Sequence, residues 1–137
     1  VLTKEFSRGP ATRRLTVTLL TFGYKFGVPY DIDLLFDVRF LKNPFFVPDL
    51  KPLPGDDPRV RAFVLSDPDA IDLLAQLESM LKFLIPLYER EQRSYLTIAI
   101  GCTGGRHRSV AIAGRLRESL GAIGHEVILK HRDLQKS

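Results

Sequence analysis

Two stretches near the start of the chain have the residue pattern of β-strands. Residues 15–22 are β-branched and apolar, alternate at first and stop at Gly23, which is typical of a strand with a buried face. Residues 33–41 again mix strand-forming residues with charges at Asp37 and Arg39. Two residues that lie two positions apart in a strand share one face. We therefore expect a surface salt bridge to a neighbouring strand, or membership of a ligand site at the strand end.

A proline-rich segment and a long helix follow. Residues 42–58 contain five prolines, which remove backbone donors and fix φ, so we predict a long surface loop without regular structure. Asp67 and Pro68 then have the residue types of a helix cap and first helical position. Apolar residues at three- and four-residue steps predict a core-packing helix, with Pro86 a candidate kink: Ile71, Leu74, Leu77, Met80, Leu81, Leu84 and Leu87.

The last third of the chain has the pattern of a β-α-β unit. Residues 95–100 predict a strand, residues 101–105 a glycine turn, residues 106–120 a helix and residues 125–131 a second strand. A crossover of this length favours parallel strands joined right-handedly. The predicted fold class is α/β, a single domain with a mostly parallel sheet and this terminal β-α-β unit. The strand order is left open.

Composition narrows the functional classes. The 137 residues fit one domain, and 45% apolar and 26% charged residues are typical of a globular chain. The chain lacks an apolar run long enough to span a membrane, and its single cysteine favours the reducing cytoplasm. We expect no metal site and no cofactor in this domain, because metal-ligand clusters and a Walker A loop are absent from the sequence. The net charge of +4 is compatible with anionic partners. Residues 1–14 form a basic lead-in that begins with Val1 rather than Met.

The glycine turn is the leading candidate site. It lies at the carboxyl end of a predicted strand and the amino end of a predicted helix, where α/β sheets collect ligands. Glycines allow close approach of backbone N–H groups, the helix end adds partial positive charge, and arginines supply forked donors. The pattern indicates a site for phosphate or a similar oxyanion, formed by Cys102, Thr103, Gly104, Gly105, Arg106, His107, Arg108 and Ser109.

Other interpretations of the same residues stay open. The glycines can simply permit a tight turn, with solvated arginines beside it. Cys102, five intervening residues and Arg108 also reproduce the spacing of cysteine-dependent phosphatases, in which a thiolate attacks phosphorus. Against an enzyme, Gly101 stands where such phosphatases usually have histidine, and there is no clear aspartate general acid. We therefore favour a binding domain over a phosphatase.

Basic residues also gather at the carboxyl terminus, at Lys130, His131, Arg132 and Lys136. They can be solvated tail charges or phosphate contacts of a bound RNA. The aromatic stacking motifs of the common RNA-binding modules are absent, so sequence-specific base readout is not indicated.

Four motifs together resemble one family. LTVTLLTFGYKFGVP at residues 15–29, LFDVRFLKNP at 35–44, GCTGGRHRSV at 101–110 and KHRDL at 130–134 are similar to the carboxyl-terminal domain of the bacterial RapZ/YvcJ family of RNase adapter proteins. The resemblance covers nearly the whole chain. It implies a phosphofructokinase-like fold and a P-loop domain that precedes residue 1 and is absent from this chain.

The resemblance also implies a function. Family members sense glucosamine-6-phosphate, bind small regulatory RNA and present it to an endoribonuclease as homo-oligomers. It implies that Thr103, Gly104 and Arg108 hold the sugar phosphate with Asp37 nearby, and that Lys130, Arg132 and Lys136 belong to an RNA-binding tail. Phe45 stands where adapter-type members have histidine, and relatives in other bacteria bind a nucleotide-activated amino sugar. The expected ligand is therefore a phosphorylated sugar or a nucleotide sugar.

Overall fold

Four parallel strands form the centre of the molecule. The computed structural model describes residues 14–136, so nearly all of the basic lead-in lies outside the described residues. The strands are β2 (Thr16–Gly23), β3 (Leu34–Asp37), β4 (Tyr95–Cys102) and β5 (Glu126–His131), in the order β3-β4-β2-β5. All three neighbouring pairs are parallel. The predicted α/β fold with a parallel sheet is confirmed.

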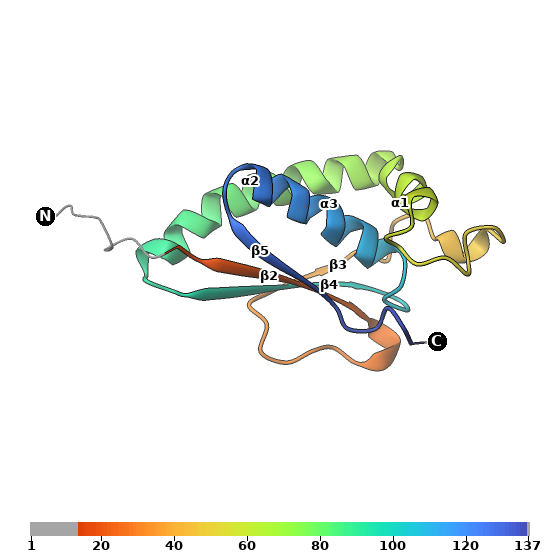
Figure 1. Cartoon of the computed structure of the whole chain (residues 1–137), viewed down its shortest axis with the longest axis horizontal. Coiled ribbons are helices and arrows are strands. Elements are labelled where there is room, and N and C mark those ends of the chain that lie inside the picture. Colours follow the sequence, from red (N-terminus) through yellow and green to blue (C-terminus); the bar gives the residue numbers. More distant parts are fainter. Residues whose placement is uncertain (1–13, 137) are drawn as a thin grey trace, which may run out of the picture.

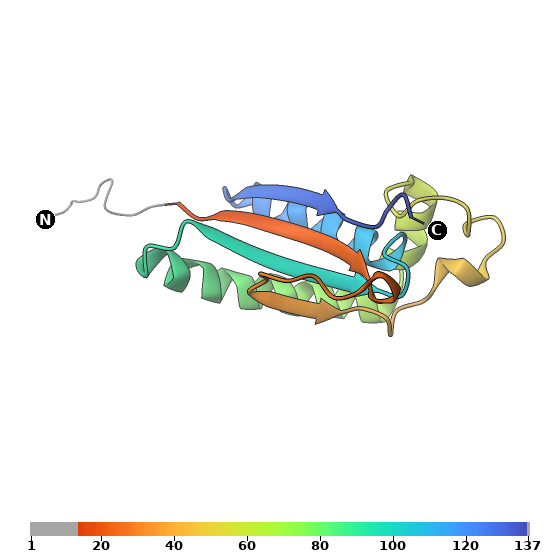
Figure 2. The ribbon, with the colours of Figure 1, turned by 90° about the horizontal axis from the view of Figure 1, so that it is seen from below.

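Three helices cover one face of this sheet, as Figure 1 shows. They are α1 (Pro58–Leu65), α2 (Pro68–Arg90) and α3 (Arg108–Ala122). In the described part of the chain no helix lies over the other face, which is turned toward the viewer in Figure 2. The core lies between the two layers, where strand residues such as Leu19 and Ile98 are fully buried together with Leu116 of α3.

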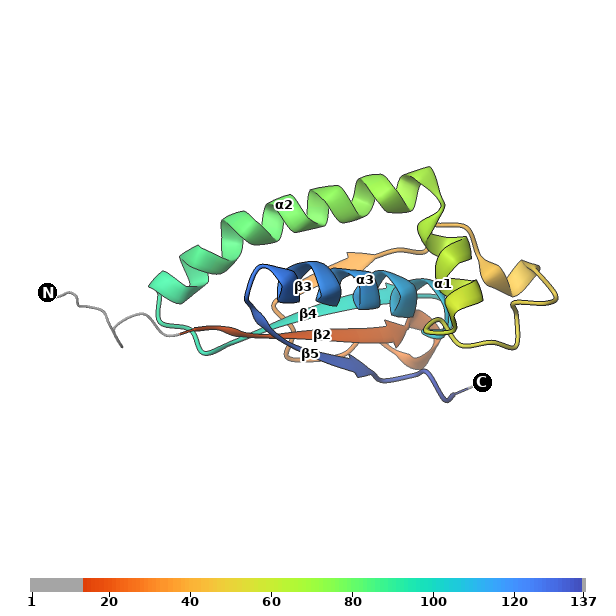
Figure 3. The same ribbon diagram turned by 45° about the horizontal axis from the view of Figure 1, so that its top comes forward.

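Helix α2 is the predicted amphipathic helix. The Asp67 carboxylate accepts hydrogen bonds from the amides of Asp69 and Lys42, which caps the helix. The 23-residue helix continues through Pro86 and runs along the length of the sheet (Figure 3). Among residues 14–136 there is no helix long and apolar enough to cross a membrane.

The predicted strand at residues 33–41 is too long. The strand ends at Asp37, and a turn follows in which the Leu41 amide donates to the Val38 carbonyl at 3.2 Å. The Arg39 amide donates to the Asp37 carboxylate instead of to a strand. The expected salt bridge to a neighbouring strand is therefore wrong, because Arg39 lies off the sheet and pairs with Asp37 itself.

The expectation that residues 42–58 lack regular structure is also wrong in two places. A 3₁₀ turn, η2 (Pro44–Phe46), is capped by the Asn43 side chain. Helix α1 begins at Pro58 and is capped by Asp57, and the sequence did not predict this helix. In both cases proline occupies the first helical position, where its fixed φ suits the helix and its missing N–H costs nothing.

Candidate functional site

The register of the sheet brings the strand ends together. Gly23 pairs with Cys102, and Asp37 pairs with Gly101, so the segments that leave β2, β3 and β4 meet at one end of the molecule. They enclose a cleft of about 650 Å³. Its described lining contains five cations and no carboxyl group, and consists of Lys25, Asn43, Phe45, Phe46, Lys51, Pro52, Cys102, Thr103, Gly104, Arg106, His107, Arg108 and Lys136.

Arg108, the first residue of α3, is a buried cation at the wall of this cleft. Only 4% of the residue is exposed. Its guanidinium donates to the carbonyls of Arg39 and Leu41 and to the Thr103 hydroxyl, while the buried Nε has no partner among the described residues. Burial lowers the pKa of Arg108, but a guanidinium keeps its charge in a protein. A buried charge of this kind is stabilised by an anion.

The amino end of α3 adds to this positive potential. His107 precedes the helix without a side-chain cap, and the first turn contains no acidic residue. The first turn of a helix presents amide N–H groups and carries partial positive charge. An oxyanion in the cleft is the complementary ligand.

The two neighbouring glycines of the turn have different roles. A Cβ on Gly104 would meet nothing within 4 Å, so this residue presents bare backbone to the cleft. Gly105 has φ +76°, and a Cβ there would lie 2.5 Å from the nitrogen of Gly23. Gly105 does not line the cleft. It allows the turn to pack against the end of β2.

Cys102 and Ser109 face each other beneath the turn. The Cys102 sulfur lies 3.2 Å from the Ser109 hydroxyl oxygen, and both residues are buried. Cys102 lines the cleft, whereas Ser109 does not. Some of the predicted loop residues, such as Cys102, therefore line the cleft, whereas others, such as Ser109, lie behind the lining.

His107 and Arg106 tie the turn to its surroundings. The Nε2 of His107 lies 3.1 Å from the Lys51 carbonyl, and Arg106 donates to the carbonyls of Leu134 and Pro52. Burial lowers the pKa of His107, so the neutral ring with a proton on Nε2 fits this contact. His107 and Arg106 therefore link the turn to the proline-rich segment, and Arg106 also links it to the carboxyl-terminal segment.

Asp37 and Arg39 lie beside the cleft and outside its lining. Arg39 donates three side-chain hydrogen bonds to the Asp37 carboxylate, and its guanidinium stacks 3.7 Å from the ring centre of Tyr24 in η1 (Tyr24–Phe26). The hydrogen bonds from Arg39 lower the pKa of Asp37, and the charge of Arg108 lowers it further. Asp37 therefore stays ionised beside the cleft.

The predicted RNA-binding residues have mostly structural partners. Arg132 and Lys136 pair with the fully buried carboxylate of Asp133. His131 lies with its Nδ1 2.8 Å from the Thr21 hydroxyl, and burial lowers its pKa. Lys130 is exposed on β5, and Lys136 also lines the cleft.

The rest of the cleft lining comes from η1, η2 and the proline-rich segment. The sequence analysis assigned none of these residues to a site: Lys25, Asn43, Phe45, Phe46, Lys51 and Pro52. Lys25 and Asn43 lie within two of the motifs that resemble the family, and Phe45 was noted only as a departure from it. The rings of Phe45 and Phe46 meet edge to face, and the Lys51 nitrogen lies 4.3 Å from the Phe45 ring centre. The sequence feature that could have indicated these residues is the length of the proline-rich loop, because long loops in compact domains are often functional.

Comparisons with known proteins show the family of the chain. Residues 15–135 match the family model described as the RapZ C-terminal domain. The chain belongs to this family. It is 55% identical over 136 residues to a nucleotide-binding protein of Anaeromyxobacter sp. (strain K), 55% over 124 residues to one of Geobacter metallireducens and 49% over 133 residues to one of Thermoanaerobacter sp. (strain X514).

These alignments cover 99%, 90% and 97% of this chain, but only 46%, 44% and 47% of the three relatives. The chain thus spans about half the length of the curated relatives it matches. Membership of the RapZ family confirms the resemblance that the four sequence motifs carry.

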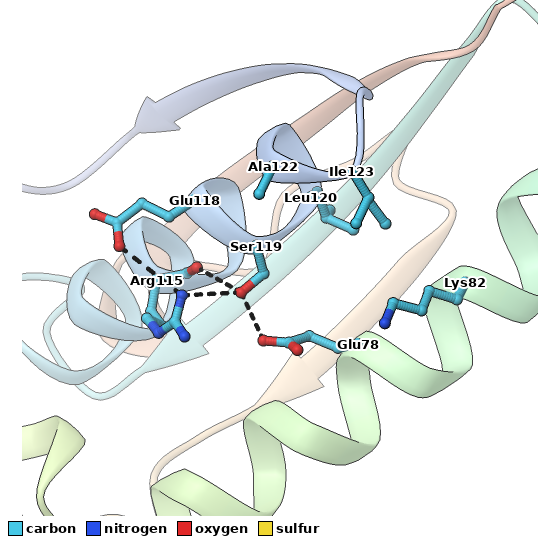
Figure 4. A pocket seen from close by; sticks show the side chains of 8 residues that line it. All are labelled: Glu78, Lys82, Arg115, Glu118, Ser119, Leu120, Ala122 and Ile123. Atoms are coloured by element: carbon cyan, nitrogen blue, oxygen red, sulfur yellow. Dashed lines mark hydrogen bonds and ion pairs between the residues drawn. The ribbon is translucent and has the colours of Figure 1, made fainter.

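A second hollow of about 260 Å³ lies between α2 and α3 (Figure 4). The Ser119 hydroxyl donates to the Glu78 carboxylate at 2.6 Å and accepts from Arg115 at 3.0 Å. These side chains thus form hydrogen bonds with one another between α2 and α3. None of the predicted site residues lines this hollow. The hydrogen bond between Ser119 and Glu78 joins α3 to α2.

Proposed function

We propose that this RapZ-family domain is a non-catalytic regulatory domain that binds a phosphorylated amino sugar in the cleft at the end of the sheet. The observation that carries the proposal is Arg108, a buried guanidinium whose Nε has no partner among residues 14–136. It lies beside an uncapped helix end and the bare backbone of Gly104. A phosphate group supplies the negative charge and acceptor oxygens that such a site lacks.

The rest of the lining suits the sugar or nucleotide part of the ligand. The Asn43 amide and the Thr103 hydroxyl can bond to sugar hydroxyls. Lys25, Lys51 and Lys136 add positive charge around the rim. A nucleotide sugar, with its second phosphate and its base, is the alternative ligand of the same class.

Calorimetry tests this proposal with matched ligands and variants. We expect glucosamine-6-phosphate to bind, and glucosamine to bind at least about tenfold more weakly because it lacks the phosphate. Arg108→Ala should abolish binding, while Arg115→Ala, an exposed arginine on α3 outside the cleft, should bind as the wild type does. Circular dichroism shows whether Arg108→Ala still folds, and Thr103→Val is the milder variant. Equal affinities of wild type and a folded Arg108→Ala protein would remove the site.

We further propose that the domain binds small RNA and thereby serves an endoribonuclease, in homo-oligomeric form. Family membership and the exposed Lys130 support this role. The ion pairs with Asp133 reduce the charge that Arg132 and Lys136 can offer to phosphates. RNA binding should therefore be modest and depend on salt.

A salt titration tests the RNA proposal. We expect a structured small RNA to bind more weakly as salt rises, with a slope that decreases by about one unit in Lys130→Ala. Undetectable or salt-independent binding would contradict the proposal.

The relatives are described as nucleotide-binding proteins, and we assign that nucleotide to the half that this chain does not cover.

A cysteine-dependent phosphatase is the second candidate function. The 3.2 Å contact between Cys102 sulfur and the Ser109 hydroxyl favours it, because a hydroxyl donor stabilises a thiolate. The carboxyl-free lining of the cleft opposes it, since a leaving group then has no carboxylic acid to protonate it. Phosphate release from an aryl phosphate that disappears in Cys102→Ser would make the enzyme the preferred function.

A further inference from the structure

The cleft at the end of the sheet offers no negative charge to a cationic group of a ligand. Five cations belong to its described lining, and no carboxyl group does: Lys25, Lys51, Arg106, Arg108 and Lys136. Within residues 14–136, only Lys136 of these five forms an ion pair, and its partner is Asp133. A positively charged group in the cleft would therefore meet like charges that repel it.

Two carboxylates beside the cleft do not change this balance. Asp133 is fully buried and is not part of the lining. Asp37 is also outside the lining, and its carboxylate already accepts three side-chain hydrogen bonds from Arg39. A ligand ammonium would thus find neither acid free at the cleft surface.

The hydrogen-bond acceptors of the lining are engaged as well. Three of its backbone carbonyls already accept hydrogen bonds, those of Lys51, Pro52 and Thr103. Their donors are the side chains of His107 and Arg106 and the amide of Lys25. An ammonium group has three donors and no acceptor, so it would compete for oxygens that are already bonded.

The wall formed by η2 combines a hydrogen-bond donor with apolar surface. The Asn43 carbonyl oxygen accepts from the Phe45 amide at 3.1 Å, which leaves the side-chain NH₂ group, a donor, for a ligand. The rings of Phe45 and Phe46 line the cleft beside it, 49% and 78% exposed. A donor next to exposed aromatic rings suits an amide group that ends in a methyl.

We infer that the cleft selects sugar phosphates whose amine is acylated over those with a free ammonium, and that N-acetylglucosamine-6-phosphate represents the selected class. The inference rests on the proposed function, because Arg108 holds the phosphate in either case. Acylation removes the positive charge and adds a carbonyl oxygen that can accept from Asn43. The acetyl methyl packs against Phe45, which makes Phe45 a specificity-determining residue of the site.

Calorimetry with three phosphates that differ at one sugar position tests the selection. Near neutral pH, N-acetylglucosamine-6-phosphate should bind about tenfold more tightly than glucosamine-6-phosphate, with glucose-6-phosphate between them. The disadvantage of glucosamine-6-phosphate should decrease as salt rises, because it is electrostatic. Equal or tighter binding of glucosamine-6-phosphate would overturn the inference and leave the phosphate site intact. If none of the three bound, the proposed function would fail together with the inference.

A matched pair of variants tests the role of Phe45. Phe45→Asp supplies the missing carboxylate at a half-exposed position of the lining, and Phe45→Asn has nearly the same shape without the charge. The asparagine variant should lose about threefold of the preference for the acetylated ligand, the contribution of one methyl contact. The aspartate variant should move the ratio about tenfold further toward glucosamine-6-phosphate. The ratio is compared within each variant, so a general change in phosphate affinity cancels. The same ratio in both variants and in the wild type would contradict the inference.

Discussion

The carboxylate of Asp133 accepts a hydrogen bond from the amide of Gly23 at 2.7 Å and joins the carboxyl-terminal segment to the end of β2. Arg132 and Lys136 donate to the same carboxylate. Asp133 is fully buried, and these partners outweigh the cost of burial and lower its pKa from 3.8 to about 2. This carboxylate is therefore a structural anchor that joins the end of β2 to the carboxyl-terminal segment, whose Lys136 lines the cleft.

Asp133→Asn should lower the free energy of unfolding at pH 7 by about 2 kcal/mol, the linkage value of a pKa lowered by nearly two units. A lowered acid pKa stabilises the fold above the pKa of the unfolded state. The difference between wild type and variant should therefore vanish as the pH falls from about 4 to 2. Urea unfolding at several pH values measures it, with the exposed Asp49→Asn as control. A pH-independent difference would contradict this assignment.

The adjacent glycines give a matched pair of substitutions. Gly105→Ala should destabilise the protein by about 2 kcal/mol or more, because alanine at positive φ is strained and its Cβ would collide with Gly23. Gly104→Ala should change stability by less than about 1 kcal/mol and weaken phosphate binding, since its Cβ would project into open space at the site. Urea unfolding and calorimetry separate the two effects. Equal destabilisation of both variants would contradict the division of roles.

The elements set by local physics were predictable from the sequence. The apolar periodicity and the cap at Asp67 locate α2, and the glycine turn between two apolar runs locates the β-α-β unit. Helix α1 was missed because prolines at residues 52, 54 and 58 indicated a loop, whereas Pro58 occupies the first helical position. Proline disfavours the interior of a helix and favours its first position. In the sequence a proline in a loop and a proline at the start of a helix look alike, because they differ only in the contacts that the residues after the proline make.

The prediction of the site from the sequence has the same limit, because only local features could be predicted. The glycine turn is a local feature, so the sequence could predict that Gly104 and Arg108 share a candidate site, and both line the cleft. Lys51 and Phe46 reach the cleft only through the path of the proline-rich segment, which no periodicity describes. The structural role of Lys136 depends on Asp133, whose burial is a tertiary property.

The buried His107 and the half-buried His131 predict a pH dependence of stability. Burial lowers the pKa of both His107 and His131 below 6.5, so the unfolded chain takes up protons first as the pH falls. The free energy of unfolding should therefore be retained above about pH 6.5 and decrease toward pH 5. His107→Gln should remove one of the two contributions and flatten the profile in part. Chemical denaturation between pH 5 and 8 measures this slope. An unchanged slope in His107→Gln would contradict its burial as a neutral ring.

The charge of Asp37 should weaken anion binding at the cleft. Its carboxylate is held by Arg39 and attracts the Arg108 guanidinium electrostatically. Asp37→Asn removes this negative charge and releases part of the positive charge of Arg39. Inorganic phosphate should therefore bind about two- to fivefold more tightly to the variant at low salt, and the gain should decrease as salt rises. Stability should change by less than about 1 kcal/mol, because the Asp37–Arg39 pair is exposed.

Comparison of two ligands decides how Asp37 acts. If its role is electrostatic, as its pairing with Arg39 implies, inorganic phosphate and glucosamine-6-phosphate should both gain affinity in Asp37→Asn. If the carboxylate instead holds the sugar amine or a hydroxyl, the sugar phosphate should lose affinity while inorganic phosphate does not. Calorimetry with both ligands distinguishes the cases, and the second result would place Asp37 in the ligand contact set that the sequence motif implies.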